Sequence, residues 1–591
     1  IARPALPTHI RSELDAELFL RLLFSALVDA DYLDTERHFA DWKATTRGSD
    51  LTLATLLERF EAHPPAPATA CTATVRAARD AMYGACVGAA AMSPGFFRLT
   101  MPTGGGKTRS GMAFALRHAI RYGKRRIIVA VPFISITQQT AKVYRDIFGD
   151  EDDRRPAVLE HHSATEGKDA DEPGYRPADI WKRLAAENWD APIVVTTTVQ
   201  LFESLFANKT GRCRKLHRLA ESVIILDEAQ ALPPHLLKPI LDALGQLVRH
   251  YGTTVVISTA TQPAFEAIAE FRAIGAREIV PDATGYFRDL TRVAYEWRTE
   301  RTYALPEVAG WLRDAPQALA VMNTKQDALD LLAALDDPDA LHLSTLLCGR
   351  HRMDVIADVT QRLHADAPCR LVATQVIEAG VDLDFPLVLR ALGPLDSIIQ
   401  AAGRCNRGGV LEHGRVIVFR PEGEHMPPGA YETATGVTQA LINRGGLDPN
   451  NPTISAQYFA AFYGAVNADA SETAKKIQGL RTAFDYPAVR KAFQMIEDDT
   501  ETVVITDYGT DEERQSVAAL LDQLRVGSPD ARYVLRKLQP YTVAIRRRAA
   551  QQYRQSGLIE GVTDNIGVWH GTYHERYGVT GESHNADRFV I

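Results

Sequence analysis

The chain has 591 residues, a formal net charge of −8 at pH 7, and a composition that is 46% hydrophobic and 24% charged, which is typical of a globular protein with several domains. No apolar run approaches the ~20 residues of a membrane-spanning helix, and no C-x-x-C pair is present, so we expect no membrane partner, no zinc site and reduced thiols in a cytoplasmic protein. The net charge does not exclude nucleic acid as a partner, because binding depends on a local positive track.

The chain opens with an amphipathic stretch that predicts a helix, ending in "FSALVDADYLDTERH" (24–38), before an Ala/Pro-rich connection (63–70). Short apolar runs then alternate with helical patterns. We expect strands at 96–101, 126–131, 193–196, 222–226 and 254–258, and in a second series at 318–322, 370–374, 386–390 and 415–419. Such runs are typical of parallel sheets covered by helices, so they predict two tandem α/β domains. From about 430, helical segments and polar loops indicate a separate C-terminal domain.

The stretch "FFRLTMPTGGGKTRSGMAFAL" predicts a buried strand, a glycine-rich turn and a helix, the form of a phosphate-binding loop. The expected ATP-binding residues are Pro102, Thr103, Gly104, Gly105, Gly106, Lys107 and Thr108. Lys107 should reach the β- and γ-phosphates, and the Thr108 hydroxyl should bind Mg²⁺. Met101 stands where such loops usually begin with glycine. The alternative is a glycine turn that binds nothing, which the strand–loop–helix context disfavours.

The stretch "SVIILDEAQALPP" places Asp227 and Glu228 at the carboxyl end of a buried strand, where α/β folds bind their ligands. Asp227 suits the Mg²⁺ shell, and Glu228 suits orienting and deprotonating the attacking water. The alternative is a solvated helix start. In "STATQPAF", Thr259 and Thr261 are candidates for coupling the nucleotide site to the second domain, although this stretch also fits an ordinary polar turn.

The stretch "ATQVIEAGVDLDFPLVLRALGPLDSIIQAAGRCNRGG" (373–409) carries Gln400, Arg404 and Arg407 at spacings i, i+4 and i+7. On one helix these side chains would share a face. Guanidinium groups brought to a γ-phosphate act as arginine fingers, which contribute about 10³–10⁵ in rate in other nucleotidases. The alternative is a basic helix face with solvated arginines.

Together MPTGGGKT, DEAQ, TAT, the T-x₅-G-V-D pattern from Thr374 to Asp382, and QAAGRCNR resemble the ordered motifs of superfamily 2 helicases. The DEAQ variant, "FALRHA" and "QAAGRCNRGG" are most similar to the helicase portion of the CRISPR-associated helicase–nucleases of type I systems, over roughly 75–425. The wording around "LTMPTGGGKT" and "HLSTLLCGRHR" is closest to the type I-C branch.

The resemblance implies an α/β fold with two tandem RecA-like domains. The implied domains are a nuclease-domain remnant with its connection at 1–62, RecA-like domain 1 at 70–290, RecA-like domain 2 at 291–425, and a linker with a C-terminal domain at 426–591. It also implies a monomer that moves 3′→5′ along single-stranded DNA using ATP and Mg²⁺. The RNA-guided surveillance complex (Cascade) would recruit it to unwind target DNA. Gly380 and Asp382 join the implied ATP site.

The resemblance further points to DNA contacts at Thr137, Thr197, Thr324 and Thr374, on a phosphate-backbone track that reads no bases. Each threonine alone is equally compatible with ordinary loop chemistry. The basic and aromatic cluster at 532–554 is either a lid over the strand or a solvated helix face.

Family members usually carry an N-terminal HD nuclease domain. "SALVDADYLDTE" resembles its final helix, in which Asp31 matches the last metal-binding carboxylate. None of the 17 histidines is followed by aspartate, and we expect His161 and His162 at the surface or near DNA. One carboxylate cannot hold the divalent transition metals of a nuclease. We therefore expect this chain to lack nuclease activity and the full-length protein to have it.

Two alternatives remain open. Another superfamily 2 enzyme, such as an RNA helicase, would be stimulated by RNA at least as well as by DNA. A nucleotide-sensing docking module would bind the surveillance complex without turnover. The presence of Lys107, Glu228, Arg404 and Arg407 favours an active enzyme, because a docking module is free to lose them.

Overall fold

The computed structural model describes residues 7–64, 73–149, 155–162, 177–378, 380–423, 425–496, 499–527, 531–563 and 566–580. The chain folds into two compact units, each with its own sheets and cores. The first unit combines Ile1–Thr291 with Leu447–Ile496, and the second combines Arg292–Gly446 with Glu497–Ile591.

The first unit is built on a seven-stranded sheet in the order β3-β4-β2-β5-β6-β1-β7, in which every pairing is parallel. Its strands are β1 (Phe96–Thr100), β2 (Arg126–Val131), β3 (Val158–His161), β4 (Ile193–Thr197), β5 (Ser222–Asp227), β6 (Thr254–Thr259) and β7 (Arg277–Glu278). The five predicted strands are confirmed to within about one residue at each end. The short edge strands β3 and β7 were not predicted, because neither forms an extended apolar run.

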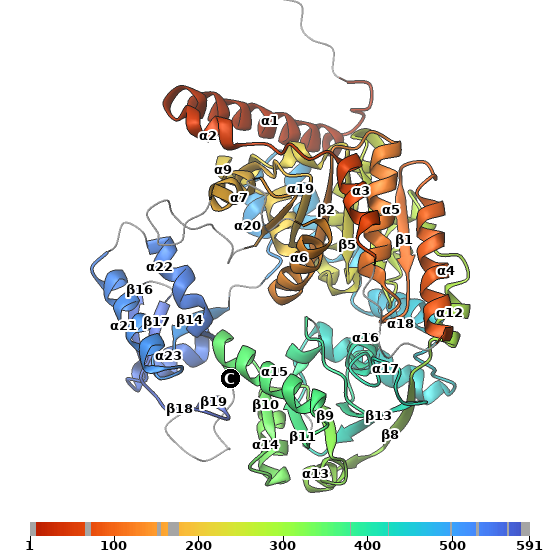
Figure 1. Ribbon diagram of the computed structural model, residues 1–591, viewed down its shortest axis with the longest axis vertical. Helices are drawn as coiled ribbons and strands as arrows, with labels where there is room; N and C mark the ends of the chain where they lie inside the picture. The colour runs from red at the N-terminus through yellow and green to blue at the C-terminus, as the bar shows by residue number, and fades with distance from the viewer. Residues whose placement is uncertain are drawn as a thin grey trace, which may run out of the picture. The chain divides into compact units, whose positions relative to one another are not determined.

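Helices surround this sheet (Figure 1). They are α1 (Glu13–Phe39), α2 (Asp41–Thr46), α3 (Leu53–Ala62), α4 (Ala73–Ala89), α5 (Lys107–Arg121), α6 (Ile134–Phe148), α7 (Pro177–Asn188), α8 (Thr198–Leu205), α9 (Thr210–Cys213), α10 (Leu237–His250), α11 (Ala269–Arg272), α12 (Ala283–Asp289), α18 (Pro452–Ala465), α19 (Glu472–Thr482) and α20 (Tyr486–Ala492). A capping box between Ser12 and Asp15 begins α1, which confirms the helix predicted there.

The helices α18 to α20 belong to the first unit, although the sequence suggested a separate domain from about 430. Arg481 of α19 is fully buried and holds them there. It donates to Glu17 Oε2 of α1 at 3.1 Å and to Asp242 Oδ2 of α10 at 2.5 Å. Glu17 also pairs with Arg21. These partners are far apart in the sequence, so helical periodicity could not reveal them.

The second unit contains a parallel six-stranded sheet in the order β10-β11-β9-β12-β13-β8. Its strands are β8 (Val293–Tyr303), β9 (Gln317–Val321), β10 (Leu341–Leu343), β11 (Cys369–Ala373), β12 (Leu387–Ala391) and β13 (Gly414–Pro421), and its helices are α13 (Leu305–Arg313), α14 (Lys325–Leu335), α15 (Gly349–His364), α16 (Leu395–Ala402) and α17 (Ala430–Arg444). The four predicted strands are confirmed. The edge strand β8 was missed because most of its side chains are half-buried or exposed, so it lacks an apolar run.

The last part of the second unit forms a four-stranded sheet in the order β15-β14-β17-β16 and a small hairpin, β18–β19. Its elements are β14 (Thr500–Val504), α21 (Asp511–Arg525), α22 (Ala531–Leu538), β15 (Thr542–Arg546), α23 (Arg547–Gln555), β16 (Ile559–Thr563), β17 (Ile566–Trp569), β18 (Tyr573–His574) and β19 (Gly578–Val579). The sequence suggested only helices and polar loops here. The Tyr573 hydroxyl accepts a hydrogen bond from the Cys348 amide, which ties the hairpin to the start of α15.

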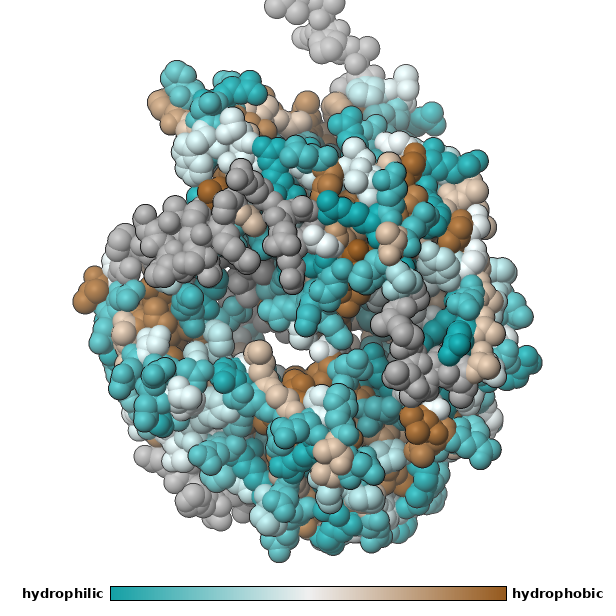
Figure 2. Space-filling view, viewed as in Figure 1, coloured by the Kyte–Doolittle hydropathy of each residue, from teal (hydrophilic) through white to brown (hydrophobic). Residues whose placement is uncertain are grey.

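The surface drawn in Figure 2 is mainly hydrophilic, with small separate hydrophobic patches. Among the described residues, no helix is long and apolar enough to cross a membrane.

Candidate nucleotide-binding and hydrolysis site

The predicted nucleotide motifs follow three neighbouring strands of the first unit, β5, β6 and β1. In the pairing register, Asp227 lies opposite Ser258, and Thr100 lies opposite Thr259. Because these strands are parallel, their carboxyl ends meet at one edge of the sheet. The structure therefore brings together the glycine-rich turn, the acidic pair and the Ser/Thr segment.

The glycine-rich turn has the backbone that its sequence requires. Gly104 and Gly106 have φ values of +75° and +91°, a region that favours glycine. A Cβ atom on Gly105 would lie 2.9 Å from the Pro102 carbonyl oxygen, so this position excludes a side chain. Gly106 is the N-cap of α5, which begins at Lys107. A helix start reached through such a turn favours an anion.

Lys107 and the acidic pair form a connected polar group. The Lys107 Nζ atom donates to Glu228 Oε1 at 2.8 Å. The other oxygen of Glu228 accepts from Gln230 Nε2 at 2.7 Å and from Thr259 Oγ1 at 3.2 Å. Thr259 also donates to Gln230 Oε1 at 2.7 Å, so it contacts both residues. This side chain thus links the acidic motif to the segment that follows β6.

Two residues of this group were not singled out by the sequence. Ser258 Oγ donates to Asp227 Oδ1 at 2.8 Å and holds that carboxylate in place. Gln230 holds Glu228 as described above. The signal for Gln230 was present, because it is the last residue of the DEAQ motif. Thr261 is buried, and its amide donates to Thr259 Oγ1 at 3.0 Å, so it supports the turn.

The two carboxyl groups have opposite pKa shifts. Burial is the largest influence on both, and it raises the pKa of Asp227, as does the neighbouring Glu228 charge. For Glu228, the Lys107 charge and the hydrogen bonds from Gln230, Lys107 and Thr259 outweigh burial and lower the pKa. Glu228 is therefore the stronger candidate for an anion able to accept a proton from water.

In the second unit, the predicted motifs follow the neighbouring strands β11, β9 and β12. Gln400 lies on α16, but that helix ends at Ala402. The expectation that Gln400, Arg404 and Arg407 share one helix face is therefore wrong. Beyond the helix end the chain turns, and Asn406 adopts a left-handed conformation with φ +47°. Gly403, the residue after α16, was the overlooked stop signal.

The two arginines of this turn have different surroundings. Arg404 is 8% exposed, and it donates to the carbonyl oxygens of Ile377 at 3.1 Å and Glu378 at 2.7 Å. Arg407 forms an ion pair with Asp382 at 2.8 Å. Gly380 precedes Asp382 by two residues and has φ +75°. The T-x₅-G-V-D segment and the arginine-bearing turn are thus directly connected.

The four threonines predicted to contact DNA have local structural roles. Thr197 and Thr324 accept hydrogen bonds from the amides three residues ahead, which caps α8 and α14. Thr137 is fully buried, and its hydroxyl donates to the Phe133 carbonyl at 3.0 Å. Thr374 is 5% exposed at the end of β11. Their contacts with DNA stay predictions.

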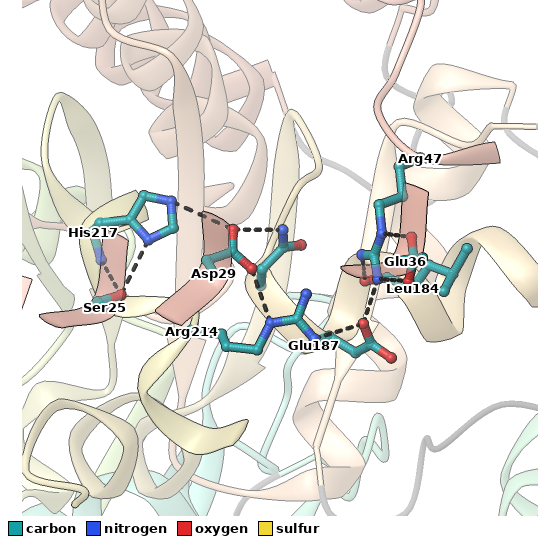
Figure 3. Close-up of polar contacts among 9 residues, drawn as sticks. Ser25, Asp29, Glu36, Arg47, Leu184, Glu187, Arg214 and His217 are labelled. Atoms are coloured by element: carbon teal, nitrogen blue, oxygen red, sulfur yellow. Dashed lines mark hydrogen bonds and ion pairs between the residues drawn. The ribbon is translucent and has the colours of Figure 1, made fainter. Parts of the chain in front are cut away.

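The acidic stretch of α1 is anchored through Asp29 (Figure 3). Asp29 is 3% exposed, and it accepts hydrogen bonds from Arg214 Nε at 2.9 Å and Asn188 Nδ2 at 3.0 Å. His217 lies beside the same carboxylate and contacts Ser25. Figure 3 also shows Arg47 between Glu36 and Glu187. These contacts hold α1 against the first unit.

Asp31, the predicted remnant of a metal site, is exposed. No group of three or more His, Cys, Asp or Glu within the described ranges could hold a metal ion. His161 and His162 are buried, so the expectation that they lie at the surface is wrong, and their proximity to DNA stays a prediction. His161 accepts a hydrogen bond from Trp189 Nε1 at 2.8 Å, and His162 contacts Glu160. Both histidines therefore support the core beside β3.

Comparison with known proteins gives matches to two protein families. Residues 68–269 match the DEAD/DEAH box helicase family, and residues 314–409 match the C-terminal part of the CRISPR-associated nuclease/helicase Cas3. A CRISPR-associated nuclease/helicase Cas3 of Haloferax volcanii is 28% identical over 448 residues, covering 58% of this chain and 48% of that protein. The relative from Methanothermobacter thermautotrophicus is 26% identical over 366 residues, covering 58% of this chain and 43% of that protein.

The chain thus spans about half the length of the curated relatives that it matches. In fold it is similar to the crystal structure of T. fusca Cas3 with AMPPNP. That match has a TM-score of 0.58 at 18% identity and covers 87% of this chain and 68% of that chain. The parallel sheets of the two units agree with tandem RecA-like domains. The two family matches, the curated relatives and the fold together support a Cas3 helicase.

Proposed function

We propose that this chain is an ATP-dependent motor that moves 3′→5′ along single-stranded DNA and unwinds target DNA in CRISPR interference. The observation that carries the proposal is the Lys107–Glu228 contact of 2.8 Å beside Asp227, at the carboxyl ends of β1 and β5, which flank β6. A phosphate-binding lysine and an ionised carboxylate that can accept a proton from water are the two groups that nucleotide hydrolysis needs first.

In this proposal, Lys107 exchanges Glu228 for the β- and γ-phosphates when ATP binds. Glu228 is then left to orient and deprotonate the attacking water, while Gln230 and Thr259 keep its carboxylate in place. Arg404 and Arg407 supply positive charge to the γ-phosphate, and Gln400 of α16 takes part in the same hydrolysis step. The glycine-rich turn, Pro102 to Thr108, holds the phosphate chain, and Gly380 and Asp382 belong to the same nucleotide site.

The residues fit a magnesium ion. The half-buried Asp227 carboxylate and the exposed Thr108 hydroxyl are oxygen donors of the type that Mg²⁺ prefers. We propose these two residues as its protein ligands. When bound, the ion would neutralise charge on the phosphates of ATP. Ser258 fixes Asp227 from the side of β6.

The similarity to CRISPR-associated nuclease/helicases supports a proposal for the nucleic-acid partner and the recruiting complex. We propose single-stranded DNA as the track, contacted near Thr137, Thr197, Thr324 and Thr374, and the RNA-guided surveillance complex as the recruiting partner. The chain would act as a monomer. Its assignment to the type I-C branch and the role of Asp31 as a former nuclease ligand stay predictions.

The test is steady-state ATP hydrolysis without nucleic acid, with single-stranded DNA, and with single-stranded RNA. We expect strong stimulation by DNA and little by RNA, with no turnover in Lys107→Ala. Stimulation by RNA alone would instead support a different superfamily 2 helicase. Absence of turnover under every condition would favour a docking module.

Direction is tested separately with DNA that carries biotin and streptavidin at one end. A 3′→5′ motor displaces streptavidin from the 5′ end and not from the 3′ end. The opposite polarity would contradict the proposed direction while leaving the motor in place.

A further inference from the structure

A fully buried arginine, Arg390, stands at the carboxyl end of β12 and takes no part in the site described above. Its guanidinium group is surrounded by polar side chains from four other segments. It donates to Asn323 Oδ1 at 2.7 Å, Ser397 Oγ at 2.9 Å, the Tyr431 hydroxyl at 3.0 Å and Glu378 Oε1 at 3.1 Å. We call these five residues the Arg390 cluster. A buried cation with this many partners fixes the segments that supply them.

The cluster joins the segments that carry the predicted motifs of the second unit. Asn323 immediately precedes Thr324 after β9, Glu378 lies in the T-x₅-G-V-D segment after β11, and Ser397 lies on α16. Ser397 Oγ lies 2.6 Å from both oxygens of Glu378. Tyr431 of α17 donates to Asn323 Oδ1 at 2.8 Å. Three loops at one sheet edge are therefore held by one set of contacts.

Arg404 is attached to this cluster through the backbone of Glu378. The carbonyl oxygens of Ile377 and Glu378 accept the two hydrogen bonds of the Arg404 guanidinium described above. Because Arg390 and Ser397 clamp the Glu378 side chain, they also restrict the carbonyl group that faces Arg404. A shift of the clamp would move the arginine.

The tight packing around the cluster is shown by Gly393. A Cβ atom on this residue would lie 2.9 Å from the Tyr431 hydroxyl oxygen, 3.1 Å from Arg390 Nη2 and 3.3 Å from Asn323 Oδ1. The position thus accepts only glycine unless these groups move. Gly393 also directly precedes Pro394, the N-cap of α16, which leads to the arginine-bearing turn.

We propose that the Arg390 cluster positions Arg404 for ATP hydrolysis, with Arg390, Glu378 and Tyr431 as positioning residues. The inference rests on the proposed function, because it requires Arg404 to act on ATP. Tyr431 lies on α17, the last helix before the chain enters the first unit at Leu447. The cluster would therefore make hydrolysis sensitive to the position of α17.

The ionisation of Glu378 offers a readout that a purely structural role would not alter. Burial raises the pKa of Glu378 to about 7, and the negative charge of Asp396 on α16 adds to the increase. Arg390 of β12 and the hydrogen bond from Ser397 of α16 lower the pKa, but they do not outweigh burial. Tyr431 of α17 is linked to Glu378 indirectly, because its hydroxyl accepts a hydrogen bond from the Arg390 guanidinium that also contacts Glu378. Protonation removes the charge that Arg390 contacts, so turnover should fall as the pH drops below about 7.

The experiment measures kcat and KM for ATP, the pH profile of kcat, and the melting temperature in Tyr431→Phe, Gly393→Ala and Glu378→Gln. We expect kcat to fall about threefold to tenfold in each variant, with KM within about twofold of the parent. The step in the pH profile near 7 should vanish in Glu378→Gln.

Two variants control for loss of a hydroxyl and gain of a methyl group. The Tyr486 hydroxyl has no hydrogen-bond partner among the described residues, and a Cβ on Gly436 would meet no described atom within 4 Å. Tyr486→Phe and Gly436→Ala should keep the parent kcat.

The variant Arg404→Ala distinguishes a failure of this inference from a failure of the proposed function. If Arg404→Ala loses turnover while all three cluster variants keep the parent kcat and pH profile, this inference is overturned and the proposed function stands. Full turnover in Arg404→Ala would overturn both this inference and the proposed role of that arginine. Should Glu378→Gln not fold, Tyr431→Phe and Gly393→Ala still decide the question.

Discussion

The two α/β units hold their charged groups in different surroundings at equivalent sheet edges. In the first unit, the Lys107 and Glu228 side chains are 14% and 25% exposed. In the second, those of Arg390 and Glu378 are 0% and 8% exposed. A partly exposed ion pair can exchange partners at low cost because water compensates for the loss, whereas a buried pair cannot. The first unit therefore offers replaceable contacts for a ligand, and the second offers a fixed support for an arginine.

The largest effect is expected from substitutions in the partly exposed Lys107–Glu228 pair of the first unit. Glu228→Gln should lower kcat for ATP by about 10²–10⁴-fold, because the amide cannot take a proton from water. ATP affinity should remain near that of the parent. Lys107→Ala is the matched variant, which should weaken both affinity and turnover. Hydrolysis by Glu228→Gln at the parent rate would show that another group is the base.

The buried cations should differ from Lys107 in their effect on stability. Arg390→Met and Arg481→Met each leave a buried carboxylate without its partner, so each should destabilise its unit by about 3–5 kcal/mol. Lys107→Met should cost about 1 kcal/mol or less, because its pair is partly exposed. Urea midpoints of the three variants give the comparison. Equal losses in Lys107→Met and Arg390→Met would remove the distinction between the two units.

Two glutamates, Glu228 in the first unit and Glu378 in the second, should contribute opposite pH dependences to stability. The Glu378 pKa is raised from 4.5 to about 7, so the folded protein keeps a proton that the unfolded chain has released. Its contribution to stability is present at low pH and is lost as the pH rises from about 4.5 to 7. The pKa of Glu228 is lowered, so its contribution is present above about 4.5 and is lost as the pH falls further.

Melting temperatures across this range check the assignment. The difference in melting temperature between the parent and Glu378→Gln should change between pH 4.5 and 7 and stay constant above pH 7. A constant difference throughout would mean that Glu378 does not titrate in this window.

The smallest effect concerns the two threonine caps. Thr197→Ala and Thr324→Ala each remove the side chain that caps a helix, α8 in the first unit and α14 in the second, and should cost about 1 kcal/mol. If the same threonines contact DNA, the affinity for single-stranded DNA should fall as well. Thr52→Ala, which removes a comparable cap from α3, is the control for stability alone. A matching loss of DNA affinity in Thr52→Ala would argue against specific contacts at the other two.

The sequence allowed the sheets and the first site to be predicted because their signals are local. Buried parallel strands are continuous apolar runs, and the glycine-rich turn and acidic pair each follow such a run. The register then places Asp227 beside Ser258 without further information. Glu228 and Lys107 are 121 residues apart, yet both could be found from their own motifs.

The Arg390 cluster could not be found in this way. Arginine and glutamate are usually surface residues, and nothing near Arg390 in the sequence marks it as buried. Its partners lie 7 to 67 residues away and belong to different loops and helices. The end of α16 before Arg404 could not be predicted for a related reason, because the regular spacing of Gln400, Arg404 and Arg407 also fits a helix that continues through Gly403.

The buried contact between Arg481 and Glu17 also has a consequence for synthesis on the ribosome. The two residues are 464 positions apart. At 5–20 residues per second, roughly 25 to 90 s separate their emergence. During that interval the entire parallel sheet of the second unit leaves the exit tunnel and is free to fold, while Glu17 has only Arg21 as its partner and Asp242 still lacks Arg481. The first unit is thus completed only after that sheet has emerged, although its own sheet is encoded first.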